Sequence, residues 1–135
     1  PFALAMSPDG GRLYAVNVWS DDVTVIDTVA RRPVAAVAVG RSPYGAAVSA
    51  AGDRVFVTNQ HADSLSVIDA AANRVIATIR VGGYPEGVAT QGDRVDVVNW
   101  MDDNLLVLDA ASGRVLATVD TGRNSRGFGQ FIGTP

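Results

Sequence analysis

Val55-Phe56-Val57-Thr58-Asn59 is one of three closely related stretches in this chain of 135 residues. The others are Leu13-Tyr14-Ala15-Val16-Asn17, which lies 42 residues earlier, and Val95-Asp96-Val97-Val98-Asn99, which lies 40 residues later. Each is a mostly apolar run of strand length, rich in β-branched residues and closed by an asparagine. A period of about 40 residues built from short strands is typical of propeller blades and other stacked units.

The repeat extends outward from this run in both directions. A proline opens each copy, at Pro1, Pro43 and Pro85. After the central run come an aspartate, at Asp27, Asp69 and Asp109, and then a glycine, at Gly40, Gly82 and Gly122. The third copy is two residues shorter, and we place this loss in one turn. We therefore divide one propeller domain into blade repeats 1–42, 43–84 and 85–124, with 125–135 as the inner strand of a further, closing blade.

Each copy contains four apolar stretches, which in the first copy are residues 2–6, 13–18, 23–26 and 34–39. Short polar turns join them, and Asp27 is placed to accept bonds from the backbone that follows it. Arg31, Asn73 and Gly113 occupy one turn position that we expect to need positive φ. Apolar residues on both faces of the middle strands predict sheets covered on both sides. The predicted fold is all-β, a propeller of three four-stranded antiparallel blades plus one C-terminal inner strand.

Composition narrows the function classes. The chain is 47% apolar, and it has a net charge of −3 without any block of one sign. This argues against a nucleic-acid partner. No apolar run approaches the length of a membrane span, so we expect no membrane insertion. There is no cysteine, which excludes disulfides, a thiol nucleophile and a thiolate metal site.

The three central runs resemble the Tyr-Val-Thr-Asn signature of the YVTN-family β-propeller repeats. Ser7-Pro8-Asp9-Gly10 before the first run, and Val25-Ile26-Asp27 and Val67-Ile68-Asp69 after the first and second, fit the same pattern. The resemblance implies a bacterial or archaeal protein of the surface-layer or periplasmic type, located in the periplasm, outside the cell or on its surface. It also implies a ring of seven blades whose closing blade takes its inner strand from the C-terminus. We therefore expect this chain to be the C-terminal part of a longer protein.

Three blades alone would leave two apolar flanks in water, because propellers close at about four to eight blades. The partners we expect are the missing blades of the same protein or, alternatively, further copies of this chain. We favour the missing blades, because the extra final strand would be redundant in a ring made of two copies.

The candidate binding residues lie where the sequence breaks its own repeat. The position after the opening proline holds a different residue type in each copy, at the start of the strand that lines the channel. These residues are Phe2, Tyr44, Glu86 and, by register, Arg126. Trp19, His61 and Trp100 lie in the loops between second and third strands, where ligand sites of propellers are expected. The tryptophans either stack on a ligand or pack within their loops. His61 is either a surface residue or a metal ligand or proton carrier.

Other positions have simpler explanations. Asp21, Asp63 and Asp103 repeat in the loops, which indicates turn stabilisation. Asp96 replaces Tyr14 and Phe56, so we expect a salt bridge to a neighbouring blade or a wet site. No serine-histidine-aspartate arrangement can be argued from the sequence, and no phosphate loop or Ca²⁺ loop is present. We predict no catalytic residue, no metal and no cofactor.

Three functions remain open at this point. The first is a non-catalytic, exported binding or scaffold module that presents its loop rim to a protein, glycan or small ligand. The second is an enzyme or redox-associated propeller with a cofactor or substrate over the channel. The third is a structural surface-layer protein.

Overall fold

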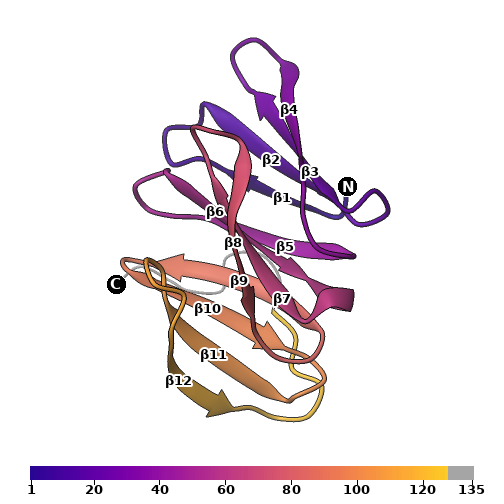
Figure 1. Ribbon diagram of the computed structural model, residues 1–135, viewed down its shortest axis with the longest axis vertical. Helices are drawn as coiled ribbons and strands as arrows, with labels where there is room; N and C mark the ends of the chain where they lie inside the picture. The colour runs from indigo at the N-terminus through magenta and orange to yellow at the C-terminus, as the bar shows by residue number, and fades with distance from the viewer. Residues whose placement is uncertain (128–135) are drawn as a thin grey trace.

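The computed structural model describes residues 1–127 and contains three four-stranded antiparallel sheets with strand orders β1-β2-β3-β4, β5-β6-β7-β8 and β9-β10-β11-β12. The sheets lie side by side as blades (Figure 1). The strands of blade 1 are β1 (Ala3–Met6), β2 (Arg12–Asn17), β3 (Asp22–Asp27) and β4 (Arg32–Ala38). Those of blade 2 are β5 (Pro43–Val48), β6 (Arg54–Asn59), β7 (Ser64–Asp69) and β8 (Arg74–Arg80), with a 3-10 turn η1 (Gln60–Ala62) after β6. Those of blade 3 are β9 (Pro85–Gln91), β10 (Arg94–Asn99), β11 (Asn104–Asp109) and β12 (Val115–Asp120).

The three predicted blades and their meander order are therefore confirmed. The predicted strands of the first copy differ from the observed ones by at most two residues at either end. Of the strand expected at 125–135, residues 128–135 lie outside the described part, and residues 125–127 are not assigned to a strand. Within residues 1–127, no helix has the length and apolar character needed to cross a membrane.

The core consists of two layers between the blades. One cluster, which includes Tyr14 and Val16 of β2, packs blade 1 against Val55 and Val57 of blade 2. The other packs Phe56 and its neighbours in blade 2 against β10 and β11 of blade 3. Blade 2 is accordingly covered on both faces, and every residue of β7 except its last is buried. This confirms the expectation drawn from apolar residues on both faces of the middle strands.

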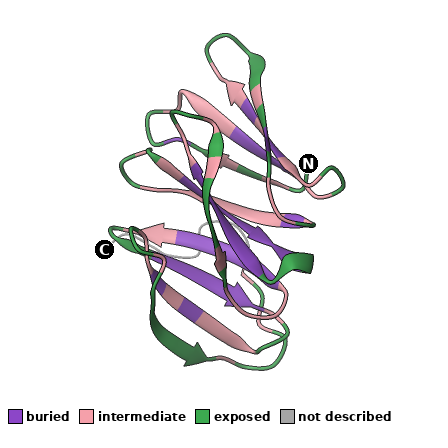
Figure 2. Cartoon of the chain, viewed as in Figure 1, coloured by how far each residue is buried: buried purple, intermediate pink, exposed green. Residues whose placement is uncertain are grey.

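The two end blades each leave one flank open. Leu4 and Met6 of blade 1 are 63% and 57% exposed, and Val119 of β12 is 50% exposed. In Figure 2 the outermost strand β12 is exposed throughout, whereas the strands at the centre are largely buried. The incomplete ring therefore suggests completion by other blades or chains, because apolar flanks of this size are rare on a monomer.

The inner strands approach one another closely enough to require glycine. A Cβ atom at Gly45 of β5 would lie 2.5 Å from the carbonyl oxygen of Glu86 in β9. A Cβ atom at Gly87, the same position of the next blade, would lie 2.5 Å from the carbonyl oxygen of Gly127. Residue 127 thus lies against β9 as β9 lies against β5. Backbone contact at these two glycines sets the spacing of the blades around the axis.

Candidate functional site

One end of the blades, which we call the rim, is formed by the loops after β2, β6 and β10 together with the connections between blades. Three aspartates, Asp21, Asp63 and Asp103, hold these two sets of loops together. Their carboxylates accept hydrogen bonds from the backbone N–H of Ser42 at 2.7 Å, Tyr84 at 3.1 Å and Asn124 at 2.6 Å. All six residues have positive φ, between 47° and 58°. The expected structural role is confirmed, but the bonds reach the following inter-blade connection, 21 residues later, instead of staying within the turn of the aspartate itself.

Below these loops, the repeated asparagine fixes the ends of the strands. Asn59 is fully buried, accepts a bond from the Gly40 N–H at 3.1 Å, and donates to the hydroxyls of Ser64 at 3.1 Å and Ser66 at 2.9 Å. Asn99 likewise accepts a bond from Gly82 at 3.1 Å. These buried hydrogen bonds hold the strand ends that support the rim loops in place.

The variable position after each proline places its side chains side by side at the channel end of the rim. The rings of Phe2 and Tyr44 have centroids 4.2 Å apart at an interplanar angle of 33°. Phe2 is 54% exposed, so the pair presents an aromatic surface to solvent. Burial, together with the nearby carboxylate of Glu86, raises the pKa of Tyr44.

Glu86 occupies the same position in blade 3 but is only 1% exposed. One carboxylate oxygen, Oε1, accepts a hydrogen bond from Gln60 Nε2 at 3.0 Å. The other, Oε2, makes no hydrogen bond with any of residues 1–127 and lies 3.8 Å from Nε of Arg126. Burial raises the pKa of Glu86, while Arg126 and Gln60 act in the opposite direction. Glu86 is therefore a buried carboxylate beside the partly exposed guanidinium of Arg126.

Arg126 connects this acidic group to a second aromatic group. Its guanidinium lies 4.7 Å from the centre of the Trp100 ring, in a cation–π arrangement. The Trp100 ring meets that of Tyr84 edge-on with centroids 5.3 Å apart, and its buried indole N–H has no hydrogen-bond partner in the described part of the chain. The four variable positions and Trp100 thus form one continuous cluster, which we call the rim cluster.

His61 extends the rim cluster outward. Its Nδ1 lies 2.7 Å from Oγ of Ser42, and its Nε2 lies 2.9 Å from the hydroxyl of Tyr84, whose ring it meets edge-on. A neutral imidazole donates to one of these hydroxyls and accepts from the other, so the three groups can pass a proton along the rim. No carboxylate orients the histidine, because Tyr84 occupies its second nitrogen.

This serine-histidine contact was not predicted from the sequence. Ser42 and His61 are 19 residues apart and belong to different loops. The available signal was that Ser42 and Tyr84 occupy the same repeat position, with His61 in the loop between them.

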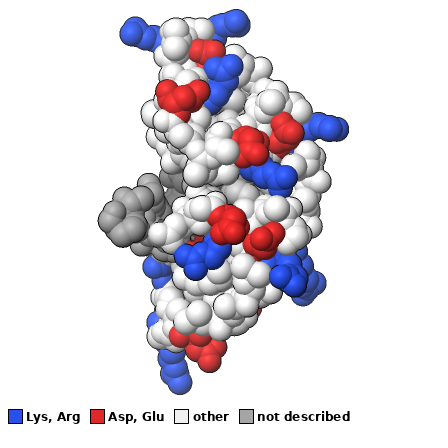
Figure 3. All heavy atoms as spheres, turned by 90° about the vertical axis from the view of Figure 1, so that its left-hand side faces the viewer, with Lys and Arg blue, Asp and Glu red and all other residues white. Residues whose placement is uncertain are grey.

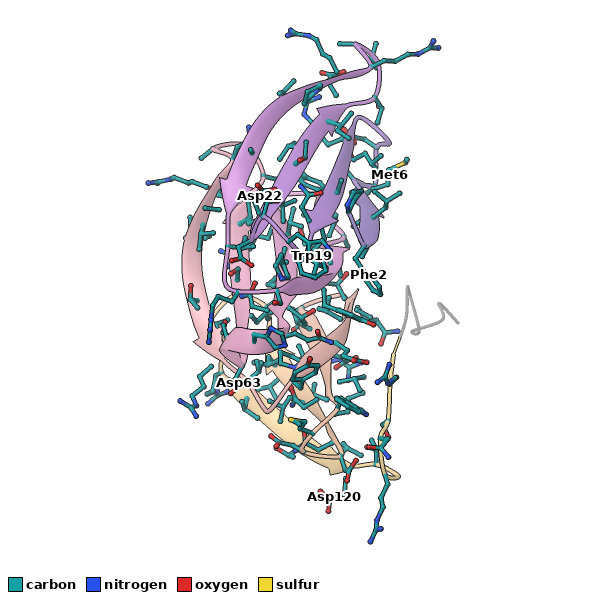
Figure 4. All side chains as sticks on the ribbon, turned by 90° about the vertical axis from the view of Figure 1, so that its right-hand side faces the viewer. Phe2, Met6, Trp19, Asp22, Asp63 and Asp120 are labelled. Atoms are coloured by element: carbon teal, nitrogen blue, oxygen red, sulfur yellow. The ribbon has the colours of Figure 1, made fainter. Side chains whose placement is uncertain are left out.

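Trp19 is not part of the rim cluster. It occupies the same repeat position as His61, but it is 99% exposed, so the alternative of packing within its loop is wrong. Figure 4 views the molecule from the rim side, with Phe2, Trp19 and the loop residue Asp63 labelled. Trp19 is available for stacking on a ligand or on another chain.

Asp96 does not form the expected salt bridge within residues 1–127. It is 9% exposed, and within residues 1–127 one of its carboxylate oxygens has no hydrogen-bond partner and no ion pair to it occurs. Burial raises its pKa, with Arg94 acting weakly in the opposite direction. Tyr14 and Phe56, its equivalents, each pack on the following blade. The expected salt bridge is therefore absent from the described blades, and Asp96 lies on the flank of blade 3 that the next blade would cover.

Residues 1–127 contain no group of three or more histidine, cysteine, aspartate or glutamate side chains positioned to hold a metal ion. The polar chemistry of the rim cluster is instead one buried carboxylate, one guanidinium, one imidazole and several aromatic faces. Such a set can bind planar, apolar or charged groups.

Comparison with solved structures identifies the architecture. The chain superimposes on a chain of Kuenenia stuttgartiensis hydrazine synthase with a TM-score of 0.89 and 29% identity, covering 93% of this chain and 37% of that one. The fold is a β-propeller. It also superimposes on U3-55K (TM-score 0.82, 11% identity, 90% and 39% covered) and on apo AztD from Citrobacter koseri (TM-score 0.77, 14% identity, 90% and 35% covered). The likeness to these last two concerns the fold alone.

The propeller chain spans between 35% and 39% of the length of these structural neighbours. Its sequence matches no known family profile, and no curated protein is significantly similar to it. The resemblance of its repeats to the YVTN type therefore stays a prediction, whereas the propeller architecture is established.

Proposed function

We propose that this propeller is a non-catalytic binding or scaffold module that presents the rim cluster to a protein, a glycan or a small ligand. The observation that carries the proposal is the convergence of the repeat-breaking residues. Phe2, Tyr44, Glu86 and Arg126 follow one another around the channel end, and each contacts or faces the next. A position that serves only the architecture would keep one chemistry, as the anchoring aspartates do.

The chemistry of the rim cluster indicates how a ligand would be held. The Phe2–Tyr44 pair offers an aromatic face for an apolar group, a sugar ring or a peptide side chain. Arg126 is 45% exposed and offers a guanidinium beside it, positioned by Glu86 and Trp100. Aromatic and arginine side chains are the residue types that dominate binding energy at interfaces.

The rest of the ring belongs to this proposal. We propose that further blades of the same, longer protein cover the open flanks of β1 and β12. The apolar exposure of those flanks supports this, as does the small share of each structural neighbour that the chain spans. A native mass spectrum tests it, because a multiple of the chain mass would show instead that copies of this chain complete the ring.

A second candidate is a propeller that forms part of an enzyme assembly. The likeness to a hydrazine synthase chain, at 29% identity, favours it. A visible absorption band or bound metal in the purified protein would support this candidate over a binding module.

We further propose export to the periplasm or the cell surface, on the resemblance to YVTN-type repeats. A surface-layer protein would form ordered arrays under the electron microscope, whereas a binding module would stay dispersed. Fractionation of cells that express the full-length protein tests the location.

The rim cluster is tested by a screen against glycan and peptide arrays with three proteins. These are the wild type, the double variant Phe2→Ala/Tyr44→Ala, and Val29→Ala, an exposed apolar residue in the β3–β4 turn at the opposite end. We expect ligands that bind the wild type and Val29→Ala but lose at least tenfold in affinity with the double variant. Ligands held equally by all three, or lost equally by both variants, would refute the rim as the site.

A further inference from the structure

A cavity of about 500 Å³ lies between blades 1 and 2 on the face opposite the rim. The turns after β1, β5 and β7 surround it, and Tyr14 and Ile76 supply apolar walls. Figure 3 views the molecule from this side and shows acidic and basic side chains interspersed on its surface. The volume falls in the range of small-molecule sites. Nothing in the proposed function uses this cavity.

The equivalent interface between blades 2 and 3 shows which chemical group occupies this position in the next repeat. Between blades 2 and 3, Nη1 of Arg54 donates hydrogen bonds to the carbonyl oxygens of Ala110 at 3.3 Å and Ala111 at 3.4 Å. An arginine guanidinium therefore closes that interface by binding the turn that follows β11.

Between blades 1 and 2 the equivalent arginine is turned away. Arg12 donates to Asp27 of its own blade at 2.6 Å. Ala70 and Ala71, which correspond to Ala110 and Ala111, line the cavity. Within residues 1–127 their carbonyls accept no side-chain hydrogen bond like those that Arg54 makes to Ala110 and Ala111. The cavity is thus the place that a guanidinium occupies at the neighbouring interface.

The charges around the cavity favour a cation. Asp9, Asp53 and Asp69 line it, and each uses only its Oδ1 atom in the hydrogen bonds of the described residues. The second carboxylate oxygen of each is free to accept. The two arginines in the lining are already engaged, Arg12 with Asp27 and Arg54 with blade 3. Carboxylates and free carbonyls together form an acceptor set that matches the donors of a guanidinium.

We infer that the cavity between blades 1 and 2 is a binding site for a small alkylguanidinium ligand. Its planar head donates to the Ala70 and Ala71 carbonyls and to the surrounding carboxylates. Its alkyl chain lies against Ile76 and Tyr14, as apolar stems of charged groups commonly do.

Titration of the ¹⁵N-labelled chain with propylguanidinium tests this inference by the amide shifts of Gly52, Ala70 and Ala71. We expect saturable shifts at these amides, and binding at least tenfold weaker for propylurea, which has the same shape without the charge. Inorganic phosphate is the third probe, because two arginines also line the cavity. Phosphate binding at these amides without propylguanidinium binding, equal binding of propylurea, or no saturable shift would each overturn the inference.

Two variants localise the site. Ile76→Trp fills the cavity and should weaken propylguanidinium binding at least tenfold. Leu116→Trp, at the same position of blade 3 and similarly exposed (46% against 43%), should change it less than twofold. Asp27→Asn frees Arg12 to reach the Ala70 and Ala71 carbonyls, so it should weaken binding by internal competition. Unchanged binding in both Ile76→Trp and Asp27→Asn would place the ligand elsewhere.

Discussion

Replacement of Asn59 by alanine tests whether the repeated asparagine holds the strand ends together. Asn59 is completely buried and makes three side-chain hydrogen bonds, with Gly40, Ser64 and Ser66. The variant leaves the Gly40 N–H without its acceptor, at a cost of about 1–3 kcal/mol, and removes two further bonds worth about 1 kcal/mol each. The expected loss in the free energy of unfolding is about 3–5 kcal/mol.

Asn17 provides a matched control at the same repeat position. It makes two bonds, to Asp22 at 2.6 Å and Thr24 at 2.8 Å, and these groups are only partly buried. Water replaces the lost partners, so Asn17→Ala should cost about 1 kcal/mol. The truncated volume is the same in both variants, and the difference therefore reports the hydrogen bonds.

Urea unfolding, followed by circular dichroism and by tryptophan fluorescence, measures both variants. Coincident transitions establish that a two-state free energy is defined. The two losses differ by about 2–4 kcal/mol, so with a slope of about 1–3 kcal/mol per molar urea Asn59→Ala should shift the midpoint about 0.7–4 M further than Asn17→Ala. Free energies for the two variants that agree within about 0.5 kcal/mol would refute the reasoning.

Three further outcomes are expected. Gly45→Ala places a Cβ atom 2.5 Å from the Glu86 carbonyl oxygen, so it should lower the free energy of unfolding in urea by about 1–3 kcal/mol or more. Gly122→Ala is the control, because no atom of the described residues lies within 4 Å of the added Cβ, and it should change that free energy by less than about 0.5 kcal/mol. Burial raises the pKa of Glu86 in the folded state above its unfolded-state value of 4.5, so the wild type loses stability as pH rises from 4.5 through the raised pKa. The stability of Glu86→Gln relative to wild type should therefore increase across this pH window. A constant difference between the two proteins from pH 4 to 7 would contradict the raised pKa. Arg126→Ala removes the counter-charge, so the pKa of Glu86, read by carboxyl ¹³C chemical shift, should rise further.

The features that the sequence predicted correctly are those set within one turn or one strand. Arg31, Asn73 and Gly113 have positive φ, between 51° and 70°, as their shared turn position indicated. Asp27 accepts bonds from the backbone N–H groups of the next turn, at Val29 and Ala30. Local backbone chemistry decides such positions, so periodicity and residue type suffice to find them.

The candidate site depended on contacts between blades, and there the sequence was less informative. The position of Glu86 at the rim was predicted, but its burial beside Arg126 depends on a chain segment 40 residues later. The contact of Ser42 with His61 likewise joins two different loops. The arginine that closes the interface between blades 2 and 3 has an identical counterpart, Arg12, whose different partner no sequence pattern reveals. Rotamer choices across interfaces follow from packing and not from spacing.

In the inner strands, one residue sets the spacing between blades and the residue before it supplies the side chain that a ligand would meet. Main-chain atoms at Gly45 and Gly87 set the distance from one blade to the next, so the side chain immediately before each glycine takes no part in that spacing. That preceding position is Tyr44 in one copy and Glu86 in the next. When such a repeat is duplicated, the glycine preserves the spacing of the blades. The residue before it can then change the binding specificity without destabilising the ring.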